Sequence, residues 1–87
     1  MTLFVITQSQ NKSYDTYDSA VVAAEDYDSA RKIHPDSALY PGVDDSVHWL
    51  RTFPTWASSP HHVEAKYLGE AAKGIESGVI CADFRAG

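Results

Sequence analysis

The stretch from Ser19 to Pro35, SAVVAAEDYDSARKIHP, decides the fold because it passes directly from a strand pattern to a helix pattern. Its first seven residues, SAVVAAE, have the β-branched centre of a strand, and the alanines leave room for a helix or an aromatic ring to lie across it. Asp26 then predicts an N-cap whose carboxylate accepts a bond from the amide of Asp28 or Ser29. Pro35 ends the helix, because the residue before a proline avoids helical dihedral angles.

The predicted helix is short and has two distinct sides. The side facing the sheet is expected to hold Tyr27, Ala30 and Ile33. Its last turns hold the basic residues Arg31, Lys32 and His34. Positive charge is favourable there, because the C-terminal end of a helix dipole is negative.

Three further strands are predicted. The segment 2–7, TLFVIT, is apolar on both faces and predicts a buried strand. The segment 61–71, HHVEAKYLGEA, alternates as a strand with one wetter face does. The segment 78–84, GVICADF, predicts a fourth strand with Cys81 in the core, and the glycines of KGIESG suggest that the third and fourth strands form a hairpin.

These elements predict a single α+β domain over residues 1–87, in the order β-β-α-β-β, with one short helix packed on a mainly antiparallel four-stranded sheet. Residues 36–60 follow no sustained period, although they carry three of the four prolines and both tryptophans. We expect SVHWLRTF, residues 46–53, to form one turn of helix or a short strand. Trp49 or Trp56 should then attach this region to the core.

Composition excludes several functional classes. The chain is 44% hydrophobic and 22% charged, as globular domains are, and its net charge of −5 argues against direct binding of nucleic acid. A single cysteine cannot form an internal disulfide, which favours a reducing compartment. The longest apolar run is too short to cross a bilayer and no signal peptide is apparent, so a cytoplasmic protein without membrane contact is predicted.

No enzyme signature is present: the chain has no G-x-S-x-G, H-E-x-x-H, Walker loop or G-x-G-x-x-G after a strand. We therefore predict no catalytic residues and no cofactor. A metal site would have to draw on His34, His48, His61 and His62 together with Asp44, Asp45 or Cys81. No C-x-x-C or helical H-x-x-x-H pair anchors such a site, so none is predicted.

The acidic stretch carries more information. Five carboxylates lie between Tyr14 and Asp28 with no lysine or arginine among them, which predicts a negative side of the sheet. One interpretation is a solvated face with a helix cap. The other is a docking surface that competes for a basic groove on another protein, with tyrosines adding contact area. The candidate partner-binding residues are Tyr14, Asp15, Tyr17, Asp18, Asp26 and Asp28.

A second, mixed set of residues would suit a phosphorylated small molecule, because arginines hold phosphate and aromatic rings stack on bases. The candidate ligand-binding residues are Arg31, His34, Trp49, Arg51 and Arg85. The competing interpretation places the tryptophans in the core and the arginines in surface ion pairs.

Several segments together resemble short uncharacterised proteins encoded by phages and prophages: YDTYDSAVVAAE (14–25), ARKIHP (30–35), YLGEA (67–71) and GVICADFRAG (78–87). The predicted scaffold also looks like the small α+β folds of several anti-CRISPR proteins. The resemblance implies a non-enzymatic inhibitor of a bacterial defence complex, active in the host cytoplasm by occluding a basic, nucleic-acid-binding protein surface. The alternatives are a sponge that sequesters an immune signalling nucleotide, as a homo-oligomer with pockets between subunits, and a phage structural accessory.

Overall fold

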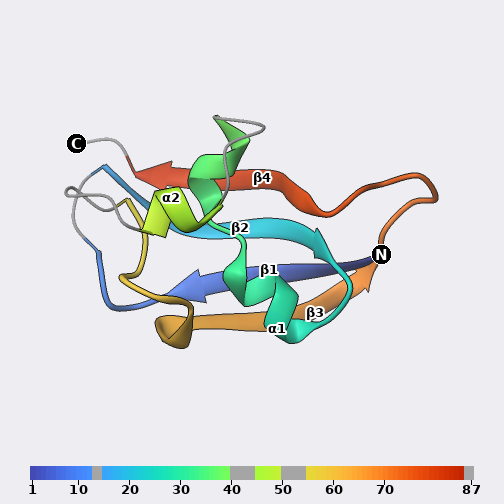
Figure 1. The fold of residues 1–87 in the computed structure, drawn as a ribbon, viewed down its shortest axis with the longest axis horizontal. Helices are drawn as coiled ribbons and strands as arrows, with labels where there is room; N and C mark the ends of the chain where they lie inside the picture. The colour runs from blue at the N-terminus through green and yellow to red at the C-terminus, as the bar shows by residue number, and fades with distance from the viewer. Residues whose placement is uncertain (13–14, 40–44, 50–54, 86–87) are drawn as a thin grey trace.

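A computed structural model describes residues 1–12, 15–39, 45–49 and 55–85 (Figure 1). Within these ranges four strands are formed: β1 (Thr2–Gln8), β2 (Thr16–Ala24), β3 (Val63–Glu70) and β4 (Gly78–Arg85). The helices are α1 (Tyr27–Lys32) and α2 (Asp45–Trp49), with 3-10 turns η1 (Pro35–Ala38) and η2 (Pro60–His62). The predicted α+β fold is confirmed, and α2 provides the predicted helical turn in the middle of the chain.

The strands form one antiparallel sheet in the order β3-β1-β2-β4. The predicted hairpin of β3 and β4 is therefore wrong, because these two strands lie at opposite edges. The pairing follows from β1, which is apolar on both faces and is shielded best when a strand lies on each side of it. β3 returns beside β1, where the Ala71 N–H donates to the Met1 carbonyl at 3.0 Å. The chain then crosses the end of the sheet to reach β4 (Figure 1).

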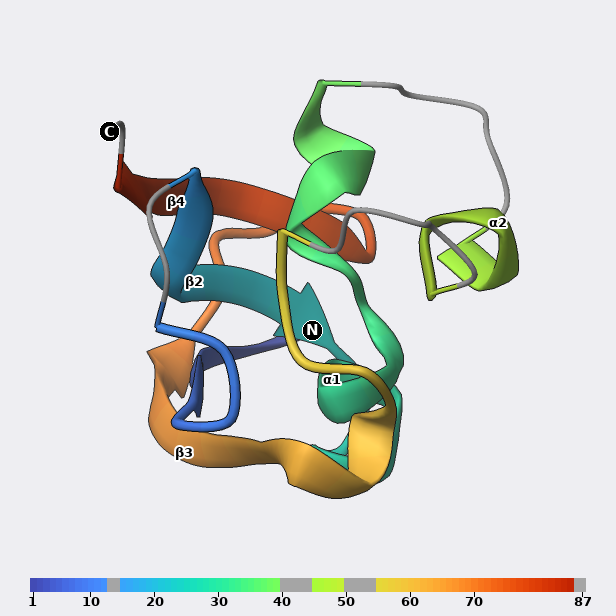
Figure 2. The same ribbon diagram turned by 90° about the vertical axis from the view of Figure 1, so that its left-hand side faces the viewer.

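The described helices all lie on one face of the sheet (Figure 2). Trp56 is fully buried beneath them, as predicted for one of the two tryptophans, and it joins the strand residues in a single cluster. The buried apolar members of that cluster are Phe4, Ile6, Tyr17, Ala20, Val22, Ala24, Ala30, Ile33, Trp56, Ala57 and Val63. The opposite face of the sheet is covered by none of the described helices.

A bulge at Ile80 decides which β4 side chains reach the core. Val79 pairs with Val22 and Cys81 pairs with Val21, so Ile80 is the extra residue. Beyond the bulge the alternation is shifted, and Ala82 packs against the core with Val79. Cys81 instead shares the uncovered face with Val21 and is exposed, which overturns the prediction that its thiol is a core group.

Candidate functional site

The start of α1 is fixed by its cap. The carboxylate of Asp26 accepts a hydrogen bond from the Ser29 N–H at 2.8 Å, which confirms one of the two predicted acceptor geometries. That bond from the Ser29 backbone, followed by one from the Ser29 side chain, lowers the pKa of Asp26. The cap therefore sets the direction in which the first residues of α1 project.

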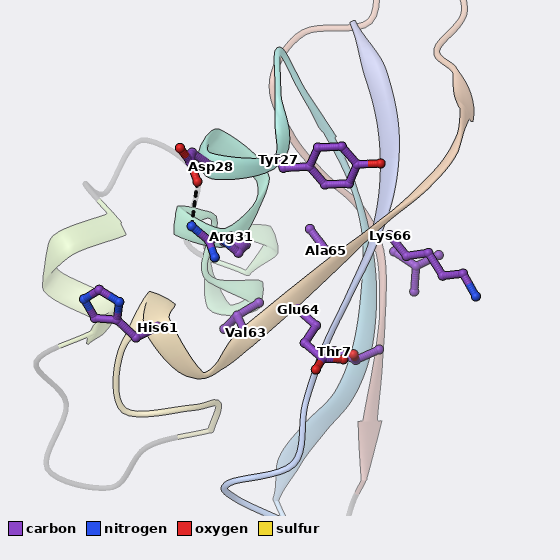
Figure 3. Close-up of a pocket in the computed structure, with 10 residues that line it drawn as sticks. Thr7, Tyr27, Asp28, Arg31, His61, Val63, Glu64, Ala65 and Lys66 are labelled. Atoms are coloured by element: carbon purple, nitrogen blue, oxygen red, sulfur yellow. Dashed lines mark hydrogen bonds and ion pairs between the residues drawn. The ribbon is translucent and has the colours of Figure 1, made fainter.

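An open groove of about 620 Å³ lies between α1 and the edge strand β3 (Figure 3). Its apolar part includes Val63 and Ala65 of β3 and the ring of Tyr27, which is 52% exposed. The Tyr27 ring is held by Phe4, with centroids 4.9 Å apart and planes inclined at 59°. The lining residues are Val5, Thr7, Tyr27, Asp28, Arg31, His61, Val63, Glu64, Ala65 and Lys66.

Arg31 is the central charged group of the helix side of this groove. It lies one turn after Tyr27, so both side chains project from the same face of α1. Its Nη2 donates to Oδ1 of Asp28 at 2.5 Å. The side chain of Arg31 is 41% exposed and that of Asp28 is 75% exposed. Its Nε is shielded from solvent and has no hydrogen-bond partner among the described residues. Nε is therefore out of reach of a ligand in the groove, which could contact only the exposed part of the Arg31 side chain.

The charges around the groove nearly cancel. Arg31 and Lys66 are balanced by Asp28 and Glu64. Figure 3 shows Tyr27 and Arg31 on the helix side of the β3 ribbon and Lys66 on the other side. The helix-side part therefore offers an aromatic ring, an arginine and an apolar floor, a combination suited to an aromatic anion of low charge.

The predicted acidic surface does not form. Asp15 and Asp18 lie at the start of β2, and Asp26 and Asp28 follow its end, so roughly 25 Å of extended chain at about 3.3 Å per residue separates the two pairs. Asp28 is also engaged by Arg31. The expectation of one continuous acidic side is thus wrong, although the inhibitory function built on it stays a prediction.

The tyrosines of the acidic stretch are also not an exposed pair. Tyr17 is only 4% exposed, and its ring lies 5.0 Å from the ring of Phe84 on β4. A bulge at Asp18 allows Tyr17 and Ala20 to share the core face. Tyr14 lies outside the described residues. The prediction that Tyr17 contributes contact area to a partner is therefore wrong.

Two members of the predicted ligand-binding set are structural. His34 is 1% exposed, and its Nδ1 accepts a hydrogen bond from the Asp36 N–H at 3.1 Å, which caps η1. Trp49 packs edge-on against the His34 ring, with centroids 4.9 Å apart, and donates from Nε1 to the Lys32 carbonyl. These contacts attach α2 to the end of α1 rather than forming a pocket.

Among the members of that set whose side chains are described, only Arg31 lines the groove. Arg51 lies outside the described residues, and for Arg85 only the position at the end of β4 is described. Eight of the ten lining residues were in neither predicted set, and those with an aromatic or charged side chain or an imidazole are Tyr27, His61, Glu64 and Lys66. The i, i+4 spacing of Tyr27 and Arg31 was the one sequence signal that could have placed Tyr27 beside Arg31.

No cluster of three or more His, Cys, Asp or Glu residues in the described ranges is arranged to hold a metal ion. No helix in the same ranges is both long enough and apolar enough to span a membrane.

Comparisons with known proteins found no matching protein family, no matching curated protein and no matching solved structure. The resemblance to phage proteins therefore stays a prediction.

Proposed function

We propose that this chain is a non-enzymatic binding protein that sequesters a small aromatic anion of the nucleotide class in the groove between α1 and β3. One observation carries the proposal: the half-exposed Tyr27 ring and Arg31 project from one face of α1 over the apolar side chains of Val63 and Ala65. A nucleobase would stack on Tyr27, and Arg31 would donate to the phosphate.

The Asp28 carboxylate restricts the charge of the ligand. It lies beside Arg31 on the helix side of the groove and would repel a triphosphate, whereas Glu64 projects with Lys66 from the other face of β3. A nucleotide with one negative charge per phosphate, such as a cyclic dinucleotide, fits this balance better. If the resemblance to phage proteins holds, such a ligand would be a signalling nucleotide of bacterial defence, and sequestration would silence it.

Occlusion of a basic protein surface is the second candidate. It is favoured by Asp15, which is exposed in the turn before β2 and has a φ of 61°. Only this end of the predicted acidic set would form the interface, because Asp26 and Asp28 lie at the far end of β2. Charge reversal of Asp15 together with Asp18 should then slow association with the partner while leaving the fold intact.

A nucleotide panel tests the leading proposal by thermal shift and calorimetry. A ligand present at one hundred times its dissociation constant should stabilise the protein by about 2.7 kcal/mol. Arg31→Gln should abolish most of that shift. Lys32→Gln is the matched control, because it removes the same charge from the next residue, which is exposed and does not line the groove.

Two results would contradict the proposed nucleotide binding. If no nucleotide stabilises the protein, the ligand class is wrong. If a nucleotide binds equally well to the wild type and to the Arg31→Gln variant, the groove is not the binding site.

A further inference from the structure

The outer edge of β3 is unpaired in the described part of the chain. β3 pairs with β1 on its inner side, and the sheet order ends at β3. An edge strand directs the N–H and C=O groups of alternate residues outward, where they can bond to another strand.

The part of this edge able to accept a strand is five residues long. From Val63 to Tyr67 the register with β1 is regular, from Gln8 to Phe4. Leu68 is then the extra residue of a bulge, which increases the local twist and ends the regular edge. No proline interrupts these five residues, VEAKY. The β4 edge is less regular, because the bulge at Ile80 lies within the strand.

The five residues are complementary to themselves when read in the opposite direction. In an antiparallel pair centred on Ala65, each Glu64 faces Lys66 of the second strand, and each Val63 faces Tyr67. Opposite charges and aromatic–aliphatic pairs are the cross-strand combinations that stabilise antiparallel pairs. From this match we infer that two copies of the chain associate through their β3 edges, with Ala65 at the two-fold axis.

The exposed charges make this pairing selective. A lysine on an edge strand usually discourages pairing, because it would be buried against an arbitrary neighbour. Here Glu64 and Lys66 are both exposed and two residues apart, on the same face of β3. A second copy of this edge offsets both charges, whereas an arbitrary apolar strand offsets neither.

The dimer would have a defined architecture. A two-fold axis perpendicular to the sheet joins the two sheets into one of eight strands and places both α1 helices on the same face. The groove of each copy then adjoins the seam, so that the partner's Tyr67 lies beside Val63 at the groove floor. The association does not require a nucleotide, and its failure would leave the proposed function intact.

Charge-swap variants test the inference by sedimentation velocity from about 1 µM to about 1 mM, because a seam this short should give a weak dimer. Wild type should shift from a monomer of 9.6 kDa towards twice that mass. Glu64→Lys alone and Lys66→Glu alone each replace two attractive contacts with two repulsive ones, and should weaken the dimer by about tenfold or more. The double variant Glu64→Lys/Lys66→Glu should restore it.

Mixing the two single variants gives the most specific test, because in that mixture only the heterodimer places opposite charges at every contact. The mixture should therefore dimerise more strongly than either variant does alone. Lys73→Glu and Glu76→Lys are controls of the same charge change at exposed positions between β3 and β4, and they should dimerise like the wild type. A wild type that stays monomeric throughout this range, or a mixture no more dimeric than its components, would overturn the inference.

Discussion

Arg31 and Asp28 bond to each other on successive turns of α1, with Nη2 and Oδ1 2.5 Å apart, in the wall of the groove that the ligand is proposed to occupy. The carboxylate therefore competes with any phosphate for the same guanidinium. This arrangement keeps Arg31 in place without a ligand, at the expense of affinity when one arrives.

Replacing Asp28 with Asn should strengthen nucleotide binding several-fold, because the competing charge is removed and the guanidinium can bond to phosphate alone. Stability should change by about 1 kcal/mol or less, since exposed ion pairs contribute little. Calorimetric titration of the variant and the wild type measures the first effect, and urea unfolding measures the second. Unchanged or weaker binding would show that Arg31 does not contact the anionic group.

The cap of α1 makes a specific prediction about pH. The pKa of Asp26 is lowered below its ordinary value of 3.8 in the folded protein. The stabilisation from this carboxylate is thus complete above that ordinary value and is lost as the pH falls through the lowered one. Asp26→Ala should lower Tm at pH 7. Asp26→Asn should retain the cap and lose this contribution to acid sensitivity.

Thermal unfolding of the three proteins between pH 2 and pH 7 checks the cap prediction. Wild type and Asp26→Asn should converge in stability as the pH falls. If Asp26→Ala and the wild type have the same Tm at pH 7, the cap does not stabilise the fold.

Substitutions at neighbouring residues of β1 should differ in their cost to stability, because the two faces of the sheet are shielded from solvent to different extents. Ile6 is fully buried under the helices, whereas Val5 is only half-buried on the other face. Ile6→Ala should cost about 2–5 kcal/mol of unfolding free energy, as deletions in tight cores do. Val5→Ala should cost clearly less, about 1 kcal/mol. Equal losses in urea unfolding would mean that the second face is also shielded from solvent.

Local chemistry in the sequence was sufficient for several elements of the fold. The apolar run of β1, the alanine-rich β2 and the Asp26 cap each depend on residues close in the chain. β1 was predicted to within one residue and the cap at the correct residue, whereas β2 begins at Thr16, three residues before its predicted start. Strand pairing depends on which strands can cover a neighbour, so the position of β3 beside β1 was missed. The bulge at Ile80 was missed too, because an alternating pattern gives no sign of an inserted residue.

The candidate site was harder to predict, because the groove is formed by two segments far apart in the chain. Arg31 was recognised from its chemistry. His61 and Lys66 line the groove only because the chain returns to the edge of the sheet to form β3, which their local sequence does not indicate. The acidic residues were wrongly expected to lie together because they are close in the sequence. An extended strand separates Asp18 from Asp26 by most of the length of the sheet.

Residue-resolved NMR during a nucleotide titration locates the binding site without any mutation. We expect the amide signals of Tyr27, Arg31, His61, Val63 and Ala65 to shift together with one dissociation constant. Signals that shift instead around Asp15 and Asp18, or a spectrum that no nucleotide changes, would contradict this expectation.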